Sequence, residues 1–246
     1  MQSDVRRIEI VGVAGTGKST LARALLARHS DWRVAESIHA RAPSHLPYFV
    51  HCAPGLICLL GHSFRRPTMN WEEVKLYVYA SEWHRYLRAR PEHSSGTTLF
   101  DQGPLFALAR LLWGRSGVTD SAWFRSWARA TAARWALELN VVVELTAPDH
   151  VLFERINERG KRHPAKGRPA MDTAEMLASH RRAYEQVLRD VERTRSVRLL
   201  RFDTSKRPLE QIADELSGAL SSASTGLDGM GSDEQRTGRA TRAARA

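Results

Sequence analysis

Cysteine is scarce in this chain: only Cys52 and Cys58 occur among its 246 residues. Two thiols cannot build a disulfide framework, and so few are typical of a reducing compartment. Because His51 and His62 lie nearby, a zinc site is the alternative to consider. The cysteines are separated by five residues and do not form a Cys-x-x-Cys pair, and Cys58 lies in an apolar, helix-like stretch. We therefore expect two buried thiols and no metal at this cluster.

Long apolar runs are also missing. The longest stretches, such as residues 56–60 and 104–108, are far shorter than the roughly 20 residues of a membrane-spanning helix. The first residues do not combine a basic segment with a sustained apolar stretch and a cleavage site, as a secretory leader would. We expect a cytoplasmic protein with no membrane partner.

Acidic residues are outnumbered, with 27 aspartates and glutamates against 37 lysines and arginines, for a formal net charge of +10. Such a charge suggests a nucleic-acid partner. The arginines, however, are spread along nearly every segment, and no nucleic-acid-binding motif accompanies them. We expect a basic surface that attracts anionic nucleotides without specific nucleic-acid recognition, and we leave a homodimer open.

The chain does contain a complete G-x-x-x-x-G-K-[ST] sequence at residues 12–19, between a strand-like run at 5–11 and a helical pattern at 19–29. Glycines let such a loop curl until its backbone N–H groups point at a polyphosphate, and the following helix adds its positive N-terminal end. We expect Lys18 to reach the β- and γ-phosphates and the Ser19 hydroxyl to contact Mg²⁺. The predicted nucleotide-binding residues of the loop are Gly12, Val13, Ala14, Gly15, Thr16, Gly17, Lys18, Ser19 and Thr20.

Four further segments have the β-branched and apolar content of strands: residues 32–35, 97–100, 141–145 and 197–202. Helical patterns lie between the strands, at residues 55–64, 71–88, 106–113 and 121–139. This alternation predicts the α/β class, as a three-layer α/β/α P-loop NTPase fold with a five-stranded parallel sheet. With 42% apolar residues, the chain can fill one such domain of about 200 residues.

Other segments depart from this alternation. Residues 39–90 form a long helical insert between the second and third strands, and residues 160–170 hold glycines, prolines and basic residues that predict a loop. The sequence from Asp172 to Glu175 has the spacing of a capping box, which predicts a helix from there to Arg193. Residues 221–246 contain few apolar side chains, so we expect a disordered tail after a domain of residues 1–220.

Two acidic residues follow predicted strands, at the end where open parallel sheets bind ligands. Asp101 closes the third strand, where it can hold Mg²⁺ or its water shell, or simply form a turn. Glu144 is a lower-ranked candidate for the same role. Glu36 follows the second strand and would lie beside the phosphate loop if the first two strands are close. There it can accept a proton from an attacking hydroxyl, although it could also be an ordinary strand-end acid.

Basic residues flank the predicted loop at 160–170. Arg155 and Arg159 are four positions apart, so they share one face of a helix, and Arg162 follows within the loop. These guanidinium groups can converge on phosphate oxygens while the loop closes and excludes water. Such closure suits phosphoryl transfer to an acceptor other than water. A solvated basic helix is the alternative.

Over about residues 5–220 the sequence resembles the P-loop nucleoside and nucleotide kinases, with thymidylate kinase and the deoxynucleoside kinases nearest. The loop at 12–20, Glu36, a substrate-side helix at 76–85, Asp101 and a lid sequence at 151–160 carry the resemblance. The resemblance implies a kinase-like domain with an acceptor-side insert at 39–90 and a lid at 154–171. Two positions depart from the family pattern: Gln102 stands where an arginine is expected, and no proline follows Glu36.

The resemblance also implies roles for individual residues. Glu36 would be the general base or an acceptor anchor, with Arg85 and Gln102 on the acceptor side. The donor phosphates would be bound by Arg155, Arg159 and Arg162. The implied activity is transfer of the γ-phosphoryl group of ATP, with Mg²⁺, to a nucleoside, nucleotide or related hydroxylated metabolite. The implied catalytic residues are Lys18, Glu36, Asp101, Arg155 and Arg159.

Two other functions stay open. The first is a P-loop ATPase or regulatory NTP-binding protein without a small-molecule acceptor; the sequence lacks a guanine-recognition motif, an Asp-Glu pair after a strand, and a transporter signature. The second, a nucleotide-dependent nucleic-acid partner, rests on charge alone.

Overall fold

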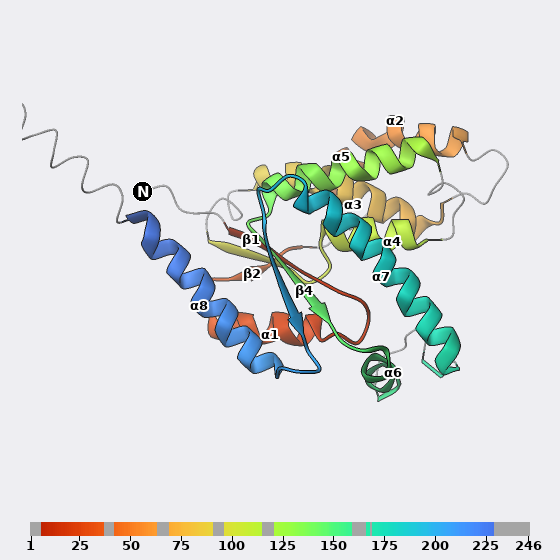
Figure 1. The fold of residues 1–246 in the computed structure, drawn as a ribbon. Helices are drawn as coiled ribbons and strands as arrows, with labels where there is room; N and C mark the ends of the chain where they lie inside the picture. The colour runs from red at the N-terminus through yellow and green to blue at the C-terminus, as the bar shows by residue number, and fades with distance from the viewer. Residues whose placement is uncertain are drawn as a thin grey trace, which may run out of the picture.

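The computed structural model describes residues 6–36, 42–62, 69–90, 96–114, 121–158, 166–167 and 169–228 (Figure 1). Five parallel strands form one sheet at its centre: β1 (Arg6–Val11), β2 (Arg33–Val34), β3 (Thr97–Phe100), β4 (Val141–Thr146) and β5 (Arg198–Asp203). Their order in space is β2-β3-β1-β4-β5. The predicted five-stranded parallel sheet is therefore confirmed.

Strand β1 lies in the middle of the sheet and faces helices on both sides. Ile8 is opposite Leu99 of β3 and Val141 of β4. Ile8 and Ile10 belong to one apolar cluster and Val11 to another, as the alternation of side chains along a strand requires. Because all five strands run the same way, the loops after their carboxyl ends meet at one edge of the sheet.

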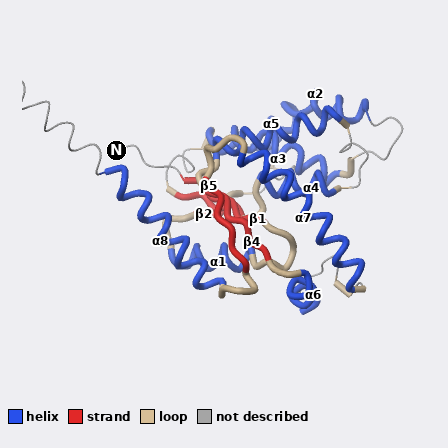
Figure 2. Tube along the Cα trace, viewed as in Figure 1, coloured by secondary structure: helices blue, strands red, loops and turns tan. Residues whose placement is uncertain are grey.

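Helices cover both faces of the sheet (Figure 2). On one face, α1 (Lys18–Arg28) and α8 (Leu209–Asp228) pack with Ile8 and Ile10. The other face carries α3 (Trp71–Arg88), α4 (Pro104–Trp113), α5 (Ala122–Glu138) and α7 (Ala170–Glu192), around the fully buried Trp83 and Trp135. The short helix α6 (Asp149–Glu158) follows β4. The expected three-layer α/β/α architecture is confirmed.

The insert between β2 and β3 contains the 3₁₀ helix η1 (Pro43–His45), α2 (Leu46–His62) and α3. The predicted bounds of α3 are confirmed, and Asn70 and Glu73 begin that helix with a reciprocal capping box. Helix α2, however, starts at Leu46 and not at residue 55, and it includes Pro54. Proline normally disfavours a helix interior, but here packing of α2 against the cluster around Trp83 outweighs that local preference.

The expectation about the start of the helix after the basic loop is wrong. Helix α7 begins at Ala170, so Asp172 lies inside its first turn and no side chain caps the helix. There the negative charge of the Asp172 carboxylate still stabilises the helix, because it lies near the positive end of the helix dipole. Helix α8 continues to Asp228, past the expected domain boundary at residue 220. The predicted tail beyond that helix lies outside the described residues.

The two cysteine side chains lie in different environments on α2. Cys52 is buried, as expected, but Cys58 is exposed, and neither forms a disulfide with a described residue. The expectation for Cys58 is wrong because the apolar stretch forms a helix with one face turned to solvent, and Cys58 lies on that face. Among the described helices, none is both long enough and apolar enough to cross a membrane.

Candidate functional site

The loop between β1 and α1 is bent by three glycines with positive φ. The angles are 141° at Gly12, 87° at Gly15 and 92° at Gly17. A Cβ atom on Gly12 would also lie 2.4 Å from the backbone oxygen of Leu145, so no larger residue fits there without a shift. Glycine is required because it adopts such angles without steric cost and allows close backbone approach. The loop therefore has the curled backbone that phosphate binding needs.

Lys18 and Thr16 bind carbonyl oxygens of the same loop. The Lys18 Nζ donates to the Gly12 and Val13 oxygens at 2.7 and 2.9 Å, and the Thr16 hydroxyl donates to Val13 at 2.9 Å. Helix α1 starts at Lys18, has no acidic residue in its first turn and no side-chain cap. Its first N–H groups and its positive end are thus directed to the loop, as an anion site at a helix N-terminus requires.

The loop is enclosed by residues from much later in the chain. Gly15 approaches Leu152 of α6, and a Cβ on Gly17 would lie 2.8 Å from the Leu209 side chain of α8. Arg155 of α6 donates to the Gly15 oxygen at 3.3 Å and to both the hydroxyl and the backbone oxygen of Thr204 at 2.9 Å. Arg155 therefore joins the phosphate loop to the segment that follows β5.

Of the other predicted lid arginines, Arg159 and Arg162 lie outside the described residues. Convergence of the three guanidinium groups stays a prediction. The structure places the first of them, Arg155, directly against the phosphate loop.

Asp101 follows β3, the neighbour of β1, at the same edge of the sheet as the loop. Its Oδ1 atom is buried and accepts no hydrogen bond from the described residues. A buried carboxylate oxygen without a donor is costly unless a ligand or a cation satisfies it. Carboxylate and hydroxyl oxygens are the donors that Mg²⁺ prefers, so Asp101 and Ser19 fit a magnesium ion.

Glu144, the alternative acid, has a different environment. It lies within β4, and its Oε2 accepts a hydrogen bond from Arg201 Nε of β5 at 2.9 Å. The same arginine also binds Glu192 at the end of α7. Glu144 is therefore engaged in an ion pair between neighbouring strands, whereas Asp101 has one oxygen available to bind a cation.

Glu36 is held by a residue that the sequence did not single out. Tyr86, at the end of α3, donates its hydroxyl to Glu36 Oε2 at 2.5 Å. The Tyr86 ring stacks on Trp83 with centroids 4.0 Å apart and meets His45 edge-on. The first two strands are not neighbours, because β3 lies between β1 and β2. Glu36 thus lies at the ligand-binding edge, two strands away from the loop.

Arg85 precedes Tyr86 and points elsewhere. Its Nη1 lies 2.5 Å from His51 Nε2 of α2, and its Nε lies 3.4 Å from Glu82 Oε2. Successive helical residues differ by about 100° in direction, so Tyr86 meets Glu36 while Arg85 pairs within the insert. Gln102 is exposed in the turn that follows β3.

Glu9 is a second functional candidate that the sequence analysis missed. It is fully buried in β1, and its two carboxylate oxygens accept hydrogen bonds from the backbone of Leu105 and Phe106 at 3.1 and 2.9 Å. Burial raises the pKa of Glu9 to about 8, and the backbone N–H groups of Phe106, Leu105 and Gly103 lower it only in part. The available signal was a charged residue between the apolar residues Ile8 and Ile10 of β1.

This fold, with its curled glycine loop after the central strand, defines a P-loop protein. The chain belongs to the AAA domain family, whose family model matches residues 8–187. A thymidylate kinase from Candida albicans shares the fold, with a TM-score of 0.57 and 13% identity, covering 91% of this chain and 94% of that one. A deoxyadenosine kinase from M. mycoides with bound dATP also shares the fold, with a TM-score of 0.50 and 14% identity, covering 87% of this chain and 99% of that one. The predicted fold likeness to nucleoside and nucleotide kinases is confirmed; no curated protein sequence matches.

Replacing Gly12 by alanine should abolish nucleotide binding and lower the free energy of unfolding by about 1–3 kcal/mol, because the backbone is strained for any L side chain. Calorimetric titration with Mg²⁺-ATP and denaturant unfolding measure the two effects. Gly218→Ala is the matched control, since its Cβ would meet nothing within 4 Å. Normal nucleotide affinity in Gly12→Ala would refute the assignment of the loop.

The raised pKa of Glu9 also predicts a pH dependence of stability. Between about pH 4.5 and pH 8 the unfolded chain loses the Glu9 proton while the folded chain keeps it, so stability falls as pH rises. Relative to Glu9→Gln, the free energy of unfolding should decline by about 1.4 kcal/mol per pH unit in that window. Tyr79 and Tyr184 face Glu9, but burial raises the pKa of both above this range. A difference that stays constant with pH would contradict the prediction.

Proposed function

We propose that this protein is a kinase that transfers the γ-phosphoryl group of ATP, with Mg²⁺, to a nucleoside, nucleotide or related hydroxylated metabolite. The observation that carries the proposal is the spacing of two acids along one edge of the sheet. Asp101 follows the strand next to β1, and Glu36 follows the strand beyond it. Neighbouring strands are about 4.8 Å apart, so these ends leave roughly 10 Å between the phosphate loop and Glu36 for an acceptor.

Each group has a distinct role in the proposed reaction. The loop amides and Lys18 bind the triphosphate, and Ser19 and Asp101 hold Mg²⁺, which neutralises negative charge on the phosphates. The acceptor oxygen bonds to the γ-phosphorus, its proton passes to Glu36, and the bond to the β-phosphate oxygen breaks to release ADP. Arg155, with Arg159 and Arg162, would stabilise charge on the transferred group.

The acceptor side is assigned to the insert at 39–90 together with Gln102. Within it, Tyr86 orients Glu36, and Arg85 points in a different direction from α3, toward His51. The enzymes that share the fold support a nucleoside or nucleotide acceptor, since they are named for deoxyadenosine and thymidylate. Two cysteines that form no disulfide with a described residue support the proposed cytoplasmic location.

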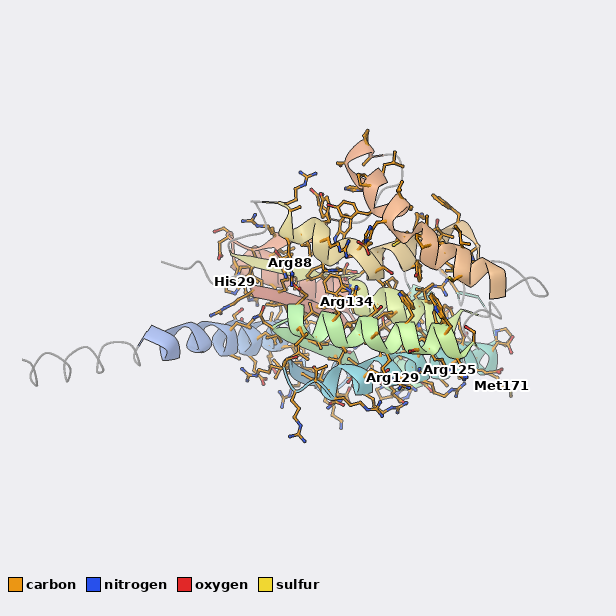
Figure 3. All side chains as sticks on the ribbon, turned by 90° about the horizontal axis from the view of Figure 1, so that it is seen from above. His29, Arg88, Arg125, Arg129, Arg134 and Met171 are labelled. Carbon is orange, nitrogen blue, oxygen red and sulfur yellow. The ribbon has the colours of Figure 1, made fainter. Side chains whose placement is uncertain are left out.

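An ATPase without an acceptor is the alternative within the same fold. A nucleic-acid partner has less support, because the labelled arginines Arg88, Arg125, Arg129 and Arg134 are spread along α3 and α5 (Figure 3). The two alternatives predict different responses to added ligands.

ADP release should rise at least tenfold when Mg²⁺-ATP is supplemented with one member of a panel of nucleosides, nucleoside monophosphates and sugars. Lys18→Ala should lower this turnover by a factor of ~10² or more, because it removes positive charge from the phosphates. Lys75→Ala, which alters an exposed ion pair with Glu72, is the matched control. Rapid turnover that no panel member increases would favour the ATPase, and stimulation by RNA or DNA would favour the nucleic-acid partner.

Tyr86→Phe removes only the hydroxyl that binds Glu36 and should reduce kcat/KM for the acceptor about tenfold, as expected for a hydrogen bond to a charged group. The affinity for Mg²⁺-ATP should stay unchanged. Steady-state kinetics with each substrate varied in turn separate the effects. Tyr77→Phe on the same helix is the control, and an equal loss in both variants would argue against a role for the Glu36 contact.

A further inference from the structure

The turn that carries Asp101 is fixed at both ends by one residue of β1. Before the turn, Glu9 lies opposite Phe100 in the last pair of the β1–β3 register. After the turn, the Glu9 carboxylate binds the start of α4 through Leu105 and Phe106. The intervening residues 101–103 therefore leave the sheet and return to the same side chain.

The Glu9 carboxylate does the work of a helix cap from a different element. Helix α4 begins with Pro104, which has no N–H group, and Gly103 provides no capping side chain. The next two N–H groups donate to the two oxygens of Glu9. An apolar residue at this buried position would leave both donors unsatisfied, which is costly inside a protein.

Close packing adds a second constraint on the same turn. A Cβ on Gly103 would lie 2.5 Å from the Glu9 Cδ and 2.7 Å from the Phe100 Cβ. Only glycine lets the beginning of α4 lie this near to the carboxylate. The position of the turn is thus determined by direct contact with Glu9.

One carboxylate oxygen of Asp101 has no comparable support. Its buried Oδ1 accepts no hydrogen bond within the described ranges. The backbone of the turn, and not a side-chain contact at that oxygen, therefore determines where this carboxylate oxygen is held.

We propose that Glu9 is a positioning residue that places the Asp101 carboxylate beside the phosphate loop. The inference rests on the proposed function in one respect, the role of Asp101 toward Mg²⁺. Because β1 also leads directly into the loop, Glu9 couples the geometry of the loop to that of the acid on the neighbouring strand.

The test is a double-mutant cycle read by binding. Calorimetric titration with a non-hydrolysable ATP analogue, with Mg²⁺ and with EDTA, gives the factor by which Mg²⁺ tightens binding. We expect Glu9→Gln to reduce that factor about tenfold and to leave the EDTA affinity within twofold, since the loop stays intact. In an Asp101→Asn background, Glu9→Gln should cause no further reduction. If Glu9→Gln reduces the Mg²⁺ factor by the same ratio in the Asp101→Asn background as in the wild-type chain, the proposal is overturned.

Two further variants separate positioning from general destabilisation. Leu216→Ala opens a cavity on the opposite face of the sheet and should leave the Mg²⁺ factor unchanged despite lower stability. Glu9→Asp keeps both acceptor oxygens but withdraws them, so it should reduce the factor by less than Glu9→Gln. If Glu9→Gln does not fold, an unaltered Mg²⁺ factor in Glu9→Asp would overturn the inference.

Failure of the inference and failure of the proposed function give different results. If the wild-type chain binds the Mg²⁺ complex but phosphorylates no acceptor, the kinase proposal fails while the cycle still tests Glu9. If the wild-type chain is an active kinase and Glu9→Gln keeps the full Mg²⁺ factor, the positioning role fails alone.

Discussion

The pairing of β1 with β3 and β4 in one parallel direction is the constraint on which the site depends. It brings the phosphate loop, the Asp101 turn and the end of β4 to one edge of the sheet. The apolar side chains of β1 maintain this pairing by packing against helices on both faces. Burial of that strand therefore supports the chemistry proposed at its end.

Features encoded over short stretches could be predicted from the sequence. The phosphate loop, the alternation of strands and helices, and the bounds of α3 depend on local spacing and on glycine at defined positions. The position of Asp101 at the ligand-binding edge followed from the same reasoning, because it required only that β3 be parallel. The role of Asp101 is still a proposal.

Features that depend on the order of strands or on contacts between distant residues could not be predicted. No local pattern indicates that β3 separates β1 from β2, so the distance of Glu36 from the loop could not be predicted. Tyr86 meets Glu36, and Glu9 meets α4, across 50 and 96 positions of the chain. The start of α2 was missed for a related reason, because packing outweighed the local effect of Pro54.

The enclosure of the phosphate loop by Leu152, Arg155, Thr204 and Leu209 has a consequence for biosynthesis. The loop leaves the ribosome before these neighbours, which emerge only after most of the domain has been translated. Until then its glycines lack the contacts that hold them in their unusual backbone angles. Nascent chains should therefore acquire nucleotide affinity late, and fragments that end before α8 should lack it.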